Sequence, residues 1–162
     1  MNIDIRRLKE SKLDEQGIYI EFDENDITTA NVMVVGPKDS LYEGGYLFFT
    51  VKFPSNYPFS PPHVKYHSNS NVRIHPNIYV NGKVCLSILG TWSGPSWTHT
   101  MDITTVLLTI QSLLDNNPLA ISSAWDIDLV WRPSPWIKIS WFFNALSINI
   151  GKCPPDQVLL DL

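Results

Sequence analysis

The chain has 162 residues, a formal net charge of −4 and a pI near 5.4. This length predicts one domain whose core needs no disulfide framework, and the acidic balance argues against nucleic acid as a partner. The two cysteines form no Cys-x-x-Cys pair, and charges interrupt the N-terminus where a signal peptide would be apolar, which predicts a soluble intracellular protein in a reducing compartment, without a membrane partner.

The first third of the chain predicts one helix followed by three strands. Residues 3–13 combine apolar residues at helical spacing with basic residues between them, which is typical of a short amphipathic helix. Every second residue of 18–22 is a large apolar one, which predicts a strand with one buried face. Residues 30–36 and 45–53 are β-branched and aromatic runs bounded by glycines, and they predict consecutive antiparallel strands.

A proline-rich corner and a long irregular loop follow. The segment FPSNYPFSPP, residues 53–62, contains prolines that cannot donate ladder hydrogen bonds, so it predicts an irregular connection. Residues 63–67 predict a short fourth strand. Residues 67–100 show no period, and their many aromatic and apolar residues favour an ordered functional loop over disorder.

The second helix is the most regular segment of the sequence. Apolar residues recur at helical spacing from Ile103 to Leu114, which predicts a helix over residues 100–114. Thr100 is the predicted N-terminal cap, with Asp102 in the first turn and Pro118 beyond the end.

Residues 120–162 differ from the rest of the chain. They hold four of the six tryptophans, several prolines and few charges. The apolar stretch 137–150 is about one helix long and is interrupted by Lys138 and Asn144, which favours a core or interfacial helix over a membrane span.

Cys85 lies in the irregular loop, where a metal site is one interpretation of its role. Two of the histidines that come before it, His63 and His67, are four residues apart on a predicted strand. That spacing separates them by roughly 13 Å, too far for one ion. No second cysteine lies near Cys85, so the sequence predicts no metal site.

Three other interpretations of Cys85 remain open from the residues alone. In a papain-like hydrolase it would pair with His75 or His99, with Asn77 as an orienting group, but no long helix begins at this cysteine. As a small buried residue it would be inert packing. In an acyl-transfer site, the rigid His-Pro-Asn turn would present the amide of Asn77 over the thiol.

Several motifs together resemble the ubiquitin-conjugating (UBC) enzyme family. HPNIYVNGKVCLSIL, residues 75–89, is similar to the active-site signature of that family, in which the acceptor cysteine follows the Asn by eight residues. GPKDSLYEGG at 36–45 looks like the family's turn before its third strand, and FPSNYPFSPPHV looks like its proline corner. The resemblance covers residues 3–119, and CLSILGTWSGPSW is especially similar to the large, Z-type members.

The resemblance implies an α+β, UBC-like fold. Its elements would be an N-terminal helix, a four-stranded antiparallel meander sheet, a long active-site loop and a central helix. Residues 1–119 would form the UBC core domain. Residues 120–162 would be an atypical Trp-rich C-terminal segment in place of the family's two charged helices, and we expect this segment to be poorly packed.

The resemblance also implies an enzyme that transfers acyl groups through a cysteine thioester. Cys85 would accept ubiquitin or a ubiquitin-like modifier from an activating enzyme and pass it to a substrate lysine or a ligase. The chain itself would bind no cofactor, because the ATP is used by the activating enzyme. Asn77 would donate to the oxyanion, and His75 and Pro76 would support its turn.

One catalytic position departs from the family pattern. Common members place an acidic residue two positions after the cysteine, where this chain has Ser87. Asp115, just after the second helix, could substitute for the family's other acidic helper, or it could be an ordinary helix-end residue.

The resemblance also implies which residues would contact partner proteins, because they occupy the positions that do so in the family. Arg6, Arg7 and Lys9 would contact the activating enzyme and ligases, and a RING or HECT ligase would grip Tyr57, Pro58, Phe59, Pro61 and Trp97. Phe59 could instead close the core. The family also implies a cis Tyr57–Pro58 bond. The implied compartment is the cytoplasm and the nucleus, and the alternative function is a noncatalytic ubiquitin-binding variant of the same fold.

Overall fold

The computed structural model describes residue 8 and residues 11–68 and 71–114 of the chain. All of them belong to the first of two units, residues 1–132, and the second unit, 133–162, lies outside the described residues. The expected boundary after residue 119 and the expected poor packing of residues 120–162 therefore stay predictions.

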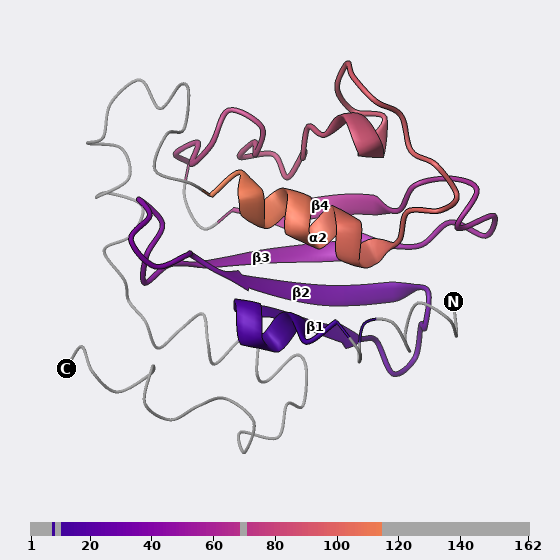
Figure 1. Cartoon of the computed structure of the whole chain (residues 1–162), viewed down its shortest axis with the longest axis horizontal. Helices are drawn as coiled ribbons and strands as arrows, with labels where there is room; N and C mark the ends of the chain where they lie inside the picture. The colour runs from indigo at the N-terminus through magenta and orange to yellow at the C-terminus, as the bar shows by residue number, and fades with distance from the viewer. Residues whose placement is uncertain (1–7, 9–10, 69–70, 115–162) are drawn as a thin grey trace. The chain divides into compact units, whose positions relative to one another are not determined.

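The centre of the fold is a four-stranded antiparallel sheet in the order β1-β2-β3-β4 (Figure 1). Its strands are β1 (Ile18–Phe22), β2 (Thr29–Val35), β3 (Tyr46–Lys52) and β4 (His63–His67). Ile20 pairs with Val32, Val32 with Phe49, and Phe49 with Tyr66 across the sheet. This register confirms the predicted meander and its four strands.

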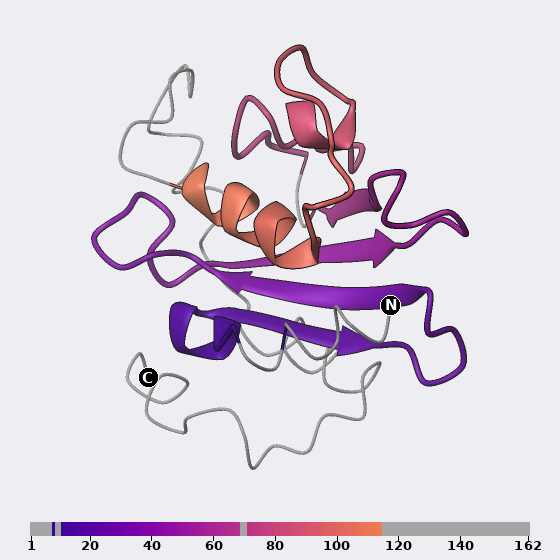
Figure 2. The same ribbon diagram turned by 45° about the vertical axis from the view of Figure 1, so that its right-hand side comes forward.

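The helix α2 (Ile103–Ser112) covers one face of this sheet, as two views of the ribbon agree (Figures 1 and 2). Its apolar side, with Val106 and Leu107 fully buried, packs into the same core as Val34 and Leu47 of the sheet. The alternation in β1 is confirmed, because Ile18, Ile20 and Phe22 all contact this core. The periodicity of the sequence thus predicted the buried faces of β1 and α2.

The start of α2 differs from the prediction. Asp102, not Thr100, is the N-terminal cap, and its carboxylate accepts the backbone N–H of Thr105 at 3.0 Å. Thr100 instead shares a hydroxyl hydrogen bond of 2.9 Å with Thr98, two residues earlier. The helix therefore begins at Ile103, because the carboxylate is the group that reaches the first free N–H groups.

The predicted N-terminal helix lies mostly outside the described residues. Leu8 is helical and buried, but Lys12 has a left-handed backbone with φ of 49°, so the prediction that the helix extends to Leu13 is wrong. The Ser11 hydroxyl donates to the Leu8 carbonyl at 2.8 Å and closes that turn. Leu13 instead opens the 3-10 helix η1 (Leu13–Gln16), which leads into β1.

The connection between β2 and β3 contacts the segment that leads to His75. A side chain at Gly36 would place its Cβ 1.6 Å from the carbonyl oxygen of Tyr42, so this close approach requires glycine. Tyr42 is fully buried, and its hydroxyl donates to the carbonyl of Ile74 at 2.9 Å. The turn at 36–45 is thereby fastened to the residue before His75.

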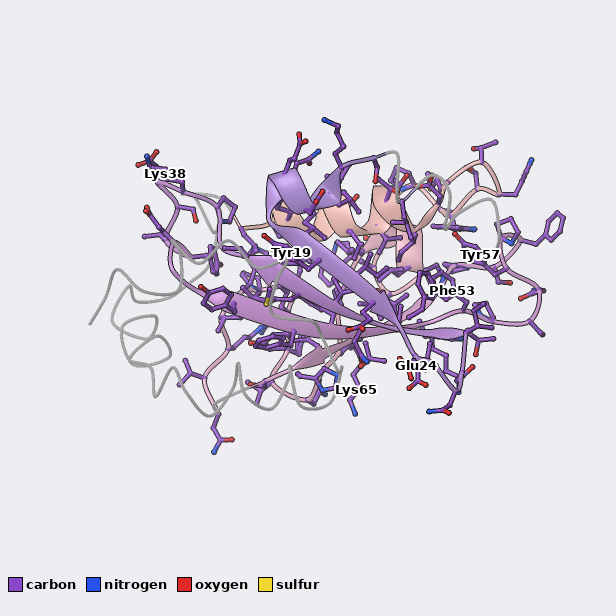
Figure 3. The ribbon with its side chains drawn as sticks, turned by 90° about the horizontal axis from the view of Figure 1, so that it is seen from below. Tyr19, Glu24, Lys38, Phe53, Tyr57 and Lys65 are labelled. Carbon is purple, nitrogen blue, oxygen red and sulfur yellow. The ribbon has the colours of Figure 1, made fainter. Side chains whose placement is uncertain are left out.

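The proline-rich corner lies at one end of the sheet. The Tyr57–Pro58 bond is cis, as predicted. The rings of Phe53 and Tyr57 meet edge to face with centroids 4.9 Å apart, and Figure 3 shows them side by side at the end of the molecule opposite Lys38. An aromatic pair of this geometry fixes the corner against the core.

Candidate active site

The segment between β4 and α2 is ordered in its described part, as the sequence predicted. Single bridges join Ile78 to His75 and to Val84, so residues 75–84 fold back on themselves as a short hairpin. The backbone N–H of Tyr66 in β4 donates to the carbonyl of Gly82 at 2.8 Å. The tip of the hairpin is therefore fixed to the edge of the sheet.

The His-Pro-Asn turn is held by its own side chains and by an arginine. Nδ1 of His75 accepts the backbone N–H of Asn77 at 3.0 Å, so this buried ring supports the turn. The Arg73 guanidinium donates to the carbonyls of His75 and Pro76. It also lies 3.8 Å above the ring of Tyr79, a cation–π contact that ties the turn to the hairpin.

Cys85 and Asn77 share a reciprocal pair of hydrogen bonds. The backbone N–H of Cys85 donates to the Asn77 carbonyl at 2.8 Å, and the Asn77 side-chain amide donates to the Cys85 carbonyl at 2.7 Å. This amide therefore lies beside the cysteine, with one N–H used for the backbone. The whole residue Cys85, side chain included, is 2% exposed, so its thiol as well as its backbone is shielded, as the inert-packing interpretation also expects.

The residues on either side of Cys85 are bound by Thr91. Its hydroxyl donates to the Val84 carbonyl at 2.7 Å and accepts the backbone N–H of Leu86 at 2.9 Å. In the chain, the 3-10 helix η2 (Ser87–Leu89) lies between Leu86 and Thr91. Trp92, directly after Thr91, is 60% exposed. The chain thus leaves the cysteine in one tight turn and emerges at the surface.

The hydrolase interpretation has no geometric support among the described residues. Cys85 precedes only the three-residue η2, and α2 begins far beyond it, so the thiol does not lie at the N-terminus of a long helix as a papain-like nucleophile would. Nδ1 of His75 is used inside its own turn. The ring of His99 stacks on Phe59 with centroids 6.2 Å apart.

The two histidines of β4 lie on the sheet rather than in a ligand cluster. His67 shares a hydrogen bond of 2.7 Å with the Thr50 hydroxyl, and burial together with the charge of Lys65 lowers its pKa. His63 is exposed at the other end of the strand. Within the described part of the chain, no three metal-binding side chains gather in one place.

The predicted ligase surface forms one connected patch. The indole N–H of Trp97 donates to the Pro58 carbonyl at 2.7 Å, and its ring lies 6.0 Å from that of Tyr57. Phe59 is 78% exposed and covered on one side by His99, so the interpretation that it closes the core is wrong. Pro61 is half-buried in the same corner.

Four predicted residues lie outside the described residues. Arg6, Arg7 and Lys9 lie in the segment that the sequence predicted as the N-terminal helix, and Asp115 comes after α2 in the sequence. Their assigned roles stay predictions. Ser87, at the position where common family members have an acidic residue, opens η2 close after the cysteine.

Three residues of the site were missed by sequence analysis. Tyr42, Arg73 and Thr91 each bind a backbone carbonyl of the turn or of the residues beside Cys85. Tyr42 lies in the motif at 36–45 and Thr91 in the motif at 85–97, but the sequence assigned no role to either side chain, because their contacts depend on the folded path of irregular segments. Arg73 lies outside the quoted motifs, and its position two residues before His75 was the signal that could have pointed to it.

The comparisons with known proteins agree with one another. The family model described as "Ubiquitin-conjugating enzyme" matches residues 3–131. The chain is 46% identical over 104 residues to Ubiquitin-conjugating enzyme E2 Z of Xenopus tropicalis and 47% identical over 104 residues to that of Homo sapiens, in each case over 63% of the chain. The solved structure of human Ubiquitin-conjugating enzyme E2 G1 superposes with a TM-score of 0.55 at 32% identity, over 67% of this chain and 89% of that one.

The matched relatives are much longer than this chain. It spans 33% of the Xenopus tropicalis relative and 29% of the Homo sapiens relative.

None of the helices in the described ranges is long and apolar enough to span a bilayer.

Proposed function

Because this chain belongs to the ubiquitin-conjugating enzyme family, we propose that Cys85 accepts the C-terminal carboxyl group of ubiquitin, or of a ubiquitin-like modifier, as a thioester. The observation that carries the proposal is the reciprocal hydrogen bonding of Cys85 with Asn77. It sets an amide donor beside a cysteine whose backbone is fixed, an arrangement that suits acyl transfer and that inert packing does not need.

The first step exchanges one thioester for another. The Cys85 thiolate attacks the carbonyl carbon of the modifier bound to the activating enzyme, a new carbon–sulfur bond forms, and the thiol of the activating enzyme leaves with the proton. ATP is consumed upstream by the activating enzyme, so this chain needs no cofactor of its own. Because the donor is already activated, the thiol needs only modest local help.

The second step passes the acyl group to an amine or to a ligase cysteine. A substrate lysine attacks the thioester, the oxyanion that develops needs a fixed donor, and the second N–H of Asn77 is the group that we assign to it. The lysine must lose a proton to attack. With Ser87 in place of an acidic residue, we propose that a ligase or Asp115 assists this loss.

The partners follow from the same proposal. An activating enzyme would bind the basic N-terminal segment, and a RING or HECT ligase would bind the patch of Tyr57, Phe59 and Trp97. The modifier and a protein substrate complete the set. A reducing compartment, the cytoplasm or the nucleus, would keep Cys85 as a free thiol.

The test is a loading reaction with purified activating enzyme, ATP and ubiquitin, read on a nonreducing gel. We expect an adduct that thiol reagents remove. Cys85→Ser should give an adduct that resists them, because an oxygen ester replaces the thioester, and Cys153→Ser, in the same chain, should load like the unaltered protein. An adduct that survives in Cys85→Ala would refute the assignment.

A folded protein that forms no adduct with any activating enzyme or modifier would refute the enzymatic proposal. Binding of free ubiquitin by such a protein, measured by NMR titration, would then establish the noncatalytic variant instead.

A further inference from the structure

One hydroxyl group holds the backbone on both sides of Cys85, and from this we infer that Thr91 is a positioning residue for the thiol. The inference rests on the proposed function, because it concerns how Cys85 is presented to the acyl donor. Thr91 does not act on the reacting atoms itself; it acts through the residues next to Cys85 in the chain.

The backbone around Cys85 is fixed by two residues, Asn77 through its backbone carbonyl and side-chain amide, and Thr91 through its hydroxyl. Asn77 takes both backbone groups of Cys85 itself, the N–H through its carbonyl and the C=O through its amide. Thr91 takes the two neighbouring groups, the Val84 carbonyl and the Leu86 N–H. Four consecutive polar groups therefore have fixed partners, and this fixes the direction in which the Cys85 side chain leaves the backbone.

The contacts of Thr91 require a group that both donates and accepts. Its hydroxyl donates to the Val84 carbonyl, lies 3.1 Å from the Leu86 carbonyl, and accepts the Leu86 N–H. The backbone N–H of Thr91 adds a bond of 3.2 Å to the Leu86 carbonyl. Serine can repeat the hydroxyl contacts, whereas valine has the shape of threonine but neither donates nor accepts.

Loss of this hydroxyl should have two opposite effects on Cys85. The thiol would lose its alignment with the incoming thioester, and acyl transfer is sensitive to displacements of about 1 Å. Residues 84–86 are buried, so a segment released from Thr91 would open more often and expose the sulfur. Transfer should therefore slow while reaction with a small reagent, which needs no alignment with a protein partner, should quicken.

The experiment compares Thr91→Val and Thr91→Ala with Thr91→Ser in the full chain. Single-turnover loading from the charged activating enzyme gives the rate at saturation and the half-saturating concentration. Iodoacetamide alkylation of Cys85 is followed by mass spectrometry of the peptide that contains it, separately from Cys153. Thr109→Val is the matched control, since it removes one hydroxyl bond, 2.7 Å to the Thr105 carbonyl, within α2.

We expect Thr91→Val to lower the saturated loading rate about 10-fold with little change in half-saturation, and to raise the alkylation rate about 10-fold. Thr91→Ser should restore both rates, and Thr109→Val should change neither. Alkylation of Thr91→Val and Thr91→Ala at the unaltered rate, or equal acceleration in Thr109→Val, would overturn the inference. If the unaltered protein does not load at all, the proposed function fails, and the alkylation rates still decide whether Thr91 holds Cys85.

Discussion

At the scale of single residues, the side-chain amide of Asn77 makes one observed contact and is proposed to make a second. One N–H supports the backbone by binding the Cys85 carbonyl at 2.7 Å, and the other is the donor that we assign to the oxyanion. A residue with both duties should affect both steps of the reaction, but not equally. The backbone duty affects loading and discharge alike, whereas the oxyanion forms most fully when an amine attacks.

Asn77→Ala should separate the two duties. We expect discharge to lysine to fall about 100-fold, corresponding to about 3 kcal/mol of transition-state stabilisation, and loading to fall by less than about 10-fold. Pulse-chase transfer of labelled ubiquitin measures both rates. Asn81→Ala is the control, because Asn81 supports only its own turn by accepting the Lys83 N–H at 3.1 Å. Equal losses in loading and discharge would show that Asn77 serves the backbone alone.

At the scale of elements, the hairpin of residues 75–84 depends on a glycine at its contact with β4. Gly82 has φ of 93°, and a Cβ there would lie 2.9 Å from the carbonyl oxygen of Tyr66. Gly44, in the β2–β3 connection, also has a left-handed φ of 75°, but a Cβ there would meet nothing within 4 Å. A side chain at either glycine would therefore strain the backbone, but only at Gly82 would it also clash with a backbone atom.

Gly82→Ala should therefore destabilise the protein more than Gly44→Ala. We expect Gly44→Ala to lower the free energy of unfolding by about 1 kcal/mol and Gly82→Ala by more than about 2 kcal/mol, because the neighbouring atom is backbone and cannot move aside cheaply. Urea unfolding followed by tryptophan fluorescence gives both values. Equal losses would mean that the hairpin is not pressed against β4.

The start of α2 offers a second test at this scale. Removing the cap with Asp102→Ala should lower the free energy of unfolding by about 1 kcal/mol, because the Thr105 N–H loses its acceptor. Thr100→Ala, which alters the residue that the sequence predicted as cap, should stay within about 0.5 kcal/mol. The reverse order of these two losses would restore the helix start that the sequence predicted.

At the scale of the whole molecule, the exposed ring of Phe59 lies apart from the core, whereas Tyr57 and Trp97 of the same patch pack against it. Phe59→Ala should leave the free energy of unfolding within about 0.5 kcal/mol but reduce ligase-stimulated discharge about 30-fold, as the loss of a buried interface aromatic would. Discharge without ligase should not change. Ile27→Ala is the control, since Ile27 is 51% exposed in the β1–β2 connection. A large loss of stability in Phe59→Ala would place its ring in the fold instead.

The sequence predicted the regular parts of the molecule well because burial leaves a period in them. The alternation in 18–22 and the helical spacing from Ile103 onward report directly which side chains face the core. The active-site loop has no such period, so its interpretation depended on the motif from His75 to Cys85. That motif correctly indicated that Asn77 lies beside Cys85.

What holds them together could not be read in the same way. Thr91 and Arg73 contribute through hydrogen bonds to backbone carbonyls, and any residue with a donor at any position in a loop could supply these. The cap of α2 was misplaced for a related reason: Thr100 and Asp102 are both good cap residues, and only the folded path decides which one reaches a free N–H.

The loop at His75 depends on the hydroxyl of Tyr42, a residue far from it in the sequence, and this dependence has an evolutionary consequence. It serves a buried carbonyl, that of Ile74, from a turn between two strands. A change to phenylalanine would preserve the ring in the core yet leave that carbonyl without its donor. Selection that preserves the His75 turn therefore also acts on Tyr42, so a lineage that lost this hydroxyl would need a compensating donor near residue 74 before its catalytic loop could diverge freely.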